Sequence, residues 1–173
     1  MIEYMTDRVL ENAGLEADEI VKIAVPRIPD RLAMLQSGEL AAATLPDPVA
    51  ALAILNGVTL IIDDSSLPEV GTSVFSFSME ILSEKPEAVA GFLAALERAV
   101  KDLKADPGQF DALLAELGLV PVPLQADFEL PPYVAATVPS EAQWQDALAW
   151  ALQAGLIENS PAYSDSVIAD YLP

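Results

Sequence analysis

The sequence predicts an α/β fold of the type II periplasmic-binding-protein kind, with one parallel-sheet lobe and an incomplete second lobe dominated by helices. Three short apolar runs alternate with stretches of helical spacing, and each run ends at a proline or a polar turn. The order strand–helix–strand–helix–strand with short connections is typical of a parallel sheet with right-handed crossovers. The runs are almost continuously apolar, as expected for strands covered on both faces.

The first part of the chain supplies the predicted sheet. Strands are expected over residues 20–25, 41–45 and 58–62. Helices are expected over residues 1–13, 29–37 and about 46–56. The helices are predicted because apolar residues recur at helical spacing, prolines begin two of them and a glycine follows each.

Helices dominate from residue 67 onward. Alternating apolar and hydroxyl side chains predict one further strand over residues 71–78. Helices are expected over residues 79–83, 86–104, 109–117, 140–154 and 164–171. The stretch 120–139 contains five prolines and is expected to be an ordered connection across a surface. We therefore place the sheet lobe with its hinge at residues 1–66 and the remainder at 67–173.

Charge excludes one class of partner. The chain has 8 Lys and Arg against 27 Asp and Glu, for a net charge of −19. A nucleic-acid backbone or an anionic membrane face would repel such a surface. No apolar run reaches the ~18 residues of a membrane span, so none is expected. The start of the chain has no basic stretch before an apolar core, so we expect no signal peptide in this chain.

The chain contains neither histidine nor cysteine. This removes the Ser–His triad, a cysteine nucleophile, the usual zinc sites and any disulfide. Adjacent acids such as Asp63 and Asp64 alternate sides of the chain and rarely chelate one ion together. We therefore expect no metal, no cofactor and no enzymatic activity.

The predicted topology nominates five residues for ligand binding. Ligands in open parallel sheets bind beyond the carboxyl ends of the strands, at helix N-termini. These positions hold Arg27, Asp30, Asp47, Ser65 and Ser66. Four of them have a second interpretation: Asp47 as a helix cap, Arg27 as a surface arginine, and the two serines as a plain polar turn. The sequence leaves these alternatives open.

Short stretches along nearly the whole chain carry a family resemblance. They are Glu3–Arg8, Ala13–Leu15, Arg31–Ala33, Ser37–Leu40, Leu45–Ala50, Glu84–Val89, Phe92–Leu93 and Tyr171–Pro173. In this order and spacing the chain resembles the C-terminal two-thirds of the nitrate/sulfonate/taurine-type substrate-binding proteins of ABC importers. By that resemblance, the amino-terminal part of the family's first lobe is missing from this chain.

The resemblance implies two lobes that close on a small organic or anionic solute in the cleft between them. It implies delivery of that solute to an ABC permease of the membrane, and an extracytoplasmic location, periplasmic or membrane-associated. Pyrimidine-synthesising relatives are expected to use a site rich in histidine and cysteine, which this chain cannot form.

The resemblance also implies that residues 67–173, the remaining part of the family's first lobe, lack their sheet partners. We expect a second copy to fill the gap, as a homo-oligomer or an element-swapped dimer. The alternative function is that of a truncated relative with no ligand, acting as an oligomerising or interaction module.

Overall fold

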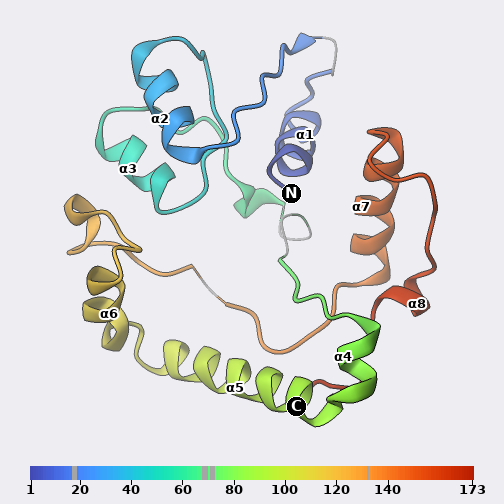
Figure 1. Cartoon of the computed structure of the whole chain (residues 1–173). Helices are drawn as coiled ribbons and strands as arrows, with labels where there is room; N and C mark the ends of the chain where they lie inside the picture. Colours follow the sequence, from blue (N-terminus) through green and yellow to red (C-terminus); the bar gives the residue numbers. More distant parts are fainter. Residues whose placement is uncertain (17–18, 68–69, 71–72, 132) are drawn as a thin grey trace. The chain divides into compact units, whose positions relative to one another are not determined.

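The structure is a computed structural model that describes residues 1–16, 19–67, 70, 73–131 and 133–173 (Figure 1). The described elements are helices, among them short 3-10 helices labelled η. In chain order they are α1 (Ile2–Asn12), α2 (Ile28–Ser37), α3 (Val49–Leu55), η2 (Asp64–Ser66), α4 (Met79–Glu84), α5 (Pro86–Ala105), η3 (Pro107–Phe110), α6 (Asp111–Glu116), η4 (Val122–Leu124), α7 (Glu141–Gln153) and α8 (Tyr163–Ser166).

The chain divides into two compact units, described separately below. Unit 1 consists of Met1–Pro68 and Gln109–Leu130, and unit 2 of Glu69–Gly108 and Pro131–Pro173. The predicted division of the chain into lobes at residues 66 and 67 stays a prediction.

Local signals in the sequence determine where the helices begin and end. Gly38 ends α2 in the left-handed conformation, with φ of 79°, which glycine adopts without strain. Ser140 and Gln143 form the predicted capping box at the start of α7. Seven of the predicted helices are confirmed close to their expected bounds. The last helix is shorter than the predicted 164–171, because the backbone is extended at the β-branched Val167.

The predicted α/β fold class is wrong: within the described residues there is no strand and no sheet. The runs 20–25, 41–45 and 58–62 are neither helical nor paired, and so is the described part, 73–78, of the expected strand 71–78. A strand exists only when a neighbouring strand accepts its backbone hydrogen bonds. Val21 is 91% exposed and Ile61 is 83% exposed, so these runs are not covered on both faces.

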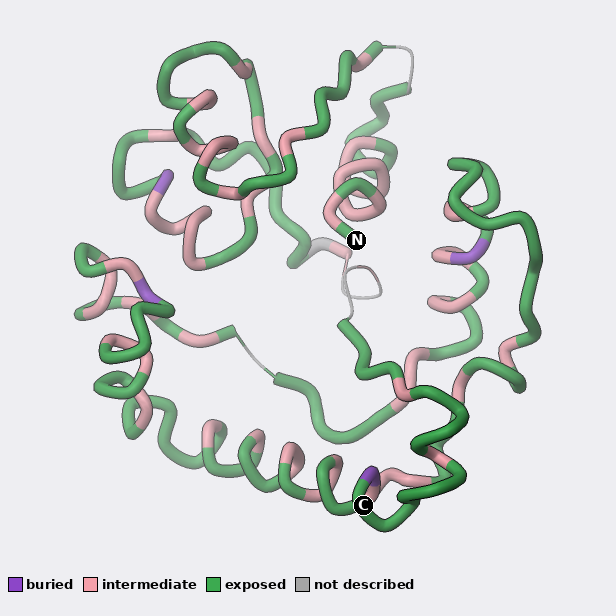
Figure 2. Tube along the Cα trace, viewed as in Figure 1, coloured by how far each residue is buried: buried purple, intermediate pink, exposed green. Residues whose placement is uncertain are grey.

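Unit 1 is built around three short helices. α2 packs against α3, and α3 packs against η4; Figure 1 shows α2 and α3 side by side. The centre of this packing is small, since Ala53 of α3 and Val120 before η4 are its buried side chains in the described part of the unit. Figure 2 accordingly shows most of the trace as exposed or intermediate.

Unit 2 contains the longest helix, α5, with α4 packed against it, while α8 packs against α7. Val89 of α5 and Leu148 of α7 are its buried apolar side chains within the described residues. Phe75 packs edge-on against Phe92 of α5, with 5.2 Å between the ring centroids. Few apolar side chains of α5 and α7 are therefore fully buried within the described residues of unit 2.

A carboxylate on α5 fixes the connection that precedes α7. The backbone N–H of Ala136 donates to a carboxylate oxygen of Glu97, at 2.7 Å. Lys101 lies one turn further along α5, with its Nζ 3.4 Å from the other oxygen of Glu97. The Ala136 hydrogen bond, and after it Lys101, hold the pKa of Glu97 below its ordinary value.

We expect Leu148→Ala to lower the free energy of unfolding by about 2–3 kcal/mol, because it removes one of the few buried side chains. Leu152 on the same helix is 37% exposed, so Leu152→Ala should lower it by about 1 kcal/mol or less. Urea unfolding followed by circular dichroism measures both values. Equal losses for the two variants would show that Leu148 is not a core residue.

We expect the charge of Glu97 to stabilise unit 2 in a pH-dependent way. A carboxylate whose pKa is lowered on folding stabilises the protein above its unfolded-state pKa, and this stabilisation is lost as the pH falls through the folded-state pKa. Glu97→Gln should therefore be less stable than wild type at neutral pH and approach it in acid. The control is Glu158→Gln, which removes the same charge from a loop. A stability difference for Glu97→Gln that does not change with pH would contradict this account.

Candidate functional site

The predicted site residues that the structure describes lie in the turns before and within the first helices of unit 1. Arg27 and Asp30 are brought together at the start of α2, with 3.7 Å between Nη1 of Arg27 and a carboxylate oxygen of Asp30. The side chain of Arg27 is 77% exposed and that of Asp30 is 49% exposed. An ion pair this open to water is weak, so the guanidinium of Arg27 is accessible to an anion.

Asp47 lies just before α3 and acts as a helix cap. Its carboxylate accepts the backbone N–H of Ala51 in the first turn, at 3.2 Å. Donors in the first turn of a helix have no partner within the helix, and a carboxylate there satisfies one of them. The carboxylate is exposed and keeps free acceptor positions. Capping therefore occupies part of its hydrogen-bonding capacity.

Ser65 lies in η2 and is bound to its own turn. Its backbone N–H donates to the carboxylate of Asp63 at 3.1 Å, and its hydroxyl donates to the same oxygen. The hydroxyl and then the backbone N–H hold the pKa of Asp63 below its ordinary value. Ser66 is also in η2, and its side chain lies outside what the structure describes. Both hydrogen-bond donors of Ser65 are therefore used within its own turn, as the interpretation of a plain polar turn predicts.

Sequence reasoning missed Arg31, the residue that organises this region. Its Nε donates to the carbonyl of Val25 at 2.5 Å, and its Nη1 donates to the carbonyl of Thr44 at 3.2 Å. The first carbonyl lies two residues before Arg27 and the second three residues before Asp47. Arg31 thus connects the two turns that carry these candidates. The available signal was an arginine one helical turn after Arg27, in the first part of α2.

Two threonines extend this connection to α1. The hydroxyl of Thr6 donates to the carbonyl of Ile2 at 2.8 Å, and the hydroxyls of Thr6 and Thr44 are 2.7 Å apart. Since a hydroxyl has one proton, Thr44 is the donor to Thr6. One chain of hydrogen bonds therefore runs from α1 through Thr44 to Arg31 of α2.

The structure joins some predicted residues and not others. Arg27 and Asp30 form a pair, as the sequence placed them on one turn. No hydrogen bond or ion pair between described residues links Asp47 or Ser65 to that pair. The candidate residues in unit 1 thus include an exposed guanidinium–carboxylate pair at α2 and an exposed carboxylate before α3, and these two helices pack together.

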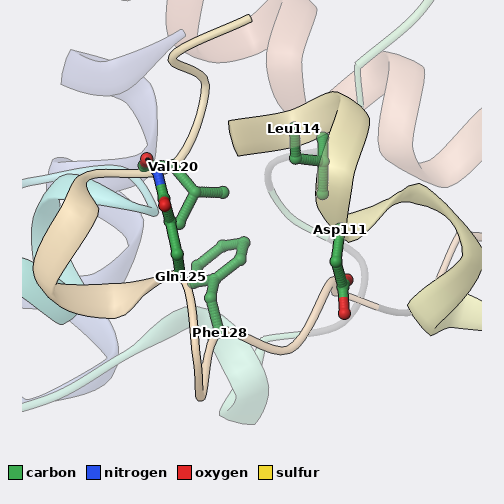
Figure 3. A pocket seen from close by; sticks show the side chains of 5 residues that line it. All are labelled: Asp111, Leu114, Val120, Gln125 and Phe128. Atoms are coloured by element: carbon green, nitrogen blue, oxygen red, sulfur yellow. Dashed lines mark hydrogen bonds between the residues drawn. The ribbon is translucent and has the colours of Figure 1, made fainter. Parts of the chain in front are cut away.

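A small pocket lies elsewhere in unit 1 and was not predicted (Figure 3). It is lined by Asp111, Leu114, Val120, Gln125 and Phe128 and has a volume of about 10 Å³, the room of a single water molecule. Figure 3 shows the first two on α6 and the other three on the segment after it. Ligand pockets are usually ~300–1,000 Å³. The amide of Gln125 already donates to the carbonyl of Val120, so this is a packing gap.

The described part of the chain was also searched for metal sites and for membrane-spanning helices. No group of three or more acidic side chains there is placed to hold a metal ion. None of the helices described combines the length and the apolar character of a membrane span.

A comparison with family models identifies the family of the chain. The family model described as NMT1-like matches residues 1–117, which include the α2 and α3 turns. The chain therefore belongs to the NMT1-like family, whose members are typically solute-binding proteins rather than enzymes and are usually extracytoplasmic. No curated protein and no solved structure matches the chain. The resemblance found in the sequence is thus confirmed at the level of the family.

We expect Ser65→Ala to raise the pKa of Asp63 toward its ordinary value, because the hydroxyl that stabilises the carboxylate is removed. Carbon-detected NMR titration of the Asp63 carboxyl group measures the change. Ser37→Ala, which removes a hydroxyl from the end of α2, should leave the Asp63 titration unchanged. An unchanged pKa in Ser65→Ala would show that the hydroxyl is not bound to Asp63 in solution.

Proposed function

We propose that the chain is the solute-binding component of an ABC importer, which takes up a small organic or anionic solute outside the cytoplasm and delivers it to a membrane permease. The observation that carries this proposal is the NMT1-like match, because it covers the part of the chain that holds the candidate site. The chain acts by binding and presentation, with no enzymatic step.

The geometry at α2 supports an anionic group on the solute. Arg27 presents an exposed guanidinium at a helix N-terminus, where the helix dipole also favours negative charge. Its partner Asp30 is 3.7 Å away, so an anion can replace this weak pair. The carboxylate of Asp47, with free acceptor positions before α3, is suited to an amine or amide on the same solute.

A second function is favoured by a different observation. Large apolar side chains are exposed in both units, among them Val21, Ile61 and Phe75. Soluble proteins rarely leave extensive apolar surface uncovered unless a partner binds it. The alternative is thus an oligomerising or interaction module that has no ligand of its own.

We expect a cognate solute to raise the thermal stability of the chain. Binding to the folded state adds RT ln(1 + [L]/Kd), about 2.7 kcal/mol at a hundredfold excess over Kd. A panel of sulfonates, nitrate, aromatic carboxylates and pyrimidines, screened by thermal shift and then by calorimetry, identifies the solute class. Arg27→Gln should weaken the binding of an anionic solute about tenfold or more, because a charge-assisted hydrogen bond is lost.

The matched control is Arg98→Gln, which removes the same charge from an exposed position on α5. If Arg98→Gln weakens binding as much as Arg27→Gln, the effect is one of net charge and Arg27 is not in the site. If no solute in the panel stabilises the folded wild-type chain, the interaction module is the better description.

A further inference from the structure

The guanidinium of Arg31 is a single planar group that binds two turns of unit 1. Its Nε donates to the carbonyl of Val25 at 2.5 Å, and its Nη1 donates to that of Thr44 at 3.2 Å. Because the two nitrogens belong to one rigid fork, the two carbonyl oxygens lie within ~8 Å of each other. The backbone N–H of Arg31 also donates to the carbonyl of Arg27, at 3.2 Å. Arg31 therefore fixes the distance between the two turns.

A proline stiffens the backbone between each bound carbonyl and the candidate residue that follows it. One residue, Pro26, separates the first carbonyl from Arg27. Two residues, the second of them Pro46, separate the other carbonyl from Asp47. The pyrrolidine ring fixes the φ of each proline at about −65°, so both connections are short and have little freedom. Holding the two carbonyls therefore restricts where both candidate side chains can lie.

The two side chains restricted in this way have opposite charges and are open to a ligand. The guanidinium of Arg27 forms a weak, exposed pair with Asp30. The carboxylate of Asp47 is exposed and accepts one N–H of α3. A solute that carries an anionic group and an amine at the matching distance can contact both. Two such contacts add most to affinity when their separation is fixed before the solute binds.

We propose that Arg31 is a positioning residue of the solute site. Through the two carbonyls that it binds, it sets the separation between the guanidinium of Arg27 and the carboxylate of Asp47. The site then selects solutes by the distance between their anionic group and their amine, and Arg31 acts without touching the solute. This proposal rests on the proposed solute binding and adds to it a selectivity for length.

Calorimetry of the full chain with a series of ω-amino carboxylates, from glycine to 6-aminohexanoate, measures this selectivity. Each is compared with the unsubstituted carboxylate of the same length, which lacks the amine for Asp47. Wild type should bind one preferred length about tenfold tighter than its unsubstituted counterpart, because a second charge-assisted hydrogen bond forms. In Arg31→Lys this advantage should fall to about twofold, because a lysine ammonium is a point charge without the planar fork that binds both carbonyls.

The control is Arg8→Lys, the same exchange on α1 of the same unit. Arg8 binds the carboxylate of Glu11 at 2.6 Å and lies over the ring of Tyr4, so this exchange removes contacts within α1. Arg8→Lys should lower the thermal stability of the chain and keep the preferred solute length. A preferred length lost equally in both variants would show that Arg31 has a structural role alone. Circular dichroism checks that each variant keeps its helices.

A second measurement needs no solute. The chain has no cysteine, so Arg27→Cys combined with Asp47→Cys places spin labels at the two candidate positions alone. Electron paramagnetic resonance should give a narrow distribution of distances between the labels, and Arg31→Lys in the same background should broaden it. An equal width in the two proteins would overturn the proposal.

The binding data separate failure of this proposal from failure of the proposed function. If solutes of the wider panel bind but wild type prefers no length, or if Arg31→Lys keeps the preferred length, the positioning role is wrong and solute binding stands. If no solute of the panel or the series binds, the proposed function is wrong and the positioning role falls with it.

Discussion

The guanidinium of Arg31 joins two apolar runs of unit 1 to α2. Two apolar runs, 20–25 and 41–45, have no backbone pairing with each other in the described chain. Arg31 donates to the carbonyl of Val25 and to that of Thr44, and so fixes the end of each run to α2. Hydrogen bonds from a charged donor are stronger than neutral ones. The positions of Arg27 and Asp47 follow, because each lies within a few residues of a fixed carbonyl.

The helices were predictable because their signals are local. Gly38, the Ser140–Gln143 capping box and the proline at the start of α5 act on the turn in which they lie. A sheet is different, since a run such as 58–62 becomes a strand only if another segment accepts its hydrogen bonds. Composition and periodicity describe the run itself and say nothing about that partner. The prediction that these runs are paired, buried strands was therefore wrong.

In the candidate site, too, the local contacts were predictable from the sequence and the long-range contacts were not. Arg27 and Asp30 lie three residues apart at a helix start, so the sequence already placed them on one turn. Asp47 was predicted either to cap a helix or to bind a ligand. Its carboxylate accepts the N–H of Ala51 in the first turn of α3, and the N-cap position itself is held by Pro48. Arg31 was missed because its partners are backbone carbonyls, which every residue has. The sequence shows an arginine one helical turn after Arg27, but it does not indicate that its acceptors are the carbonyls of Val25 and Thr44.

Arg27 and Arg31 lie one helical turn apart and have separate roles. Arg31 donates to the backbone carbonyls of Val25 and Thr44. The guanidinium of Arg27 is 77% exposed and forms a weak pair with Asp30. An anionic group can therefore replace Asp30 at Arg27 without disturbing the hydrogen bonds that fix the two turns. Because the structural role and the proposed ligand role fall on different guanidinium groups, loss of Arg27 affects solute binding and leaves these turns in place.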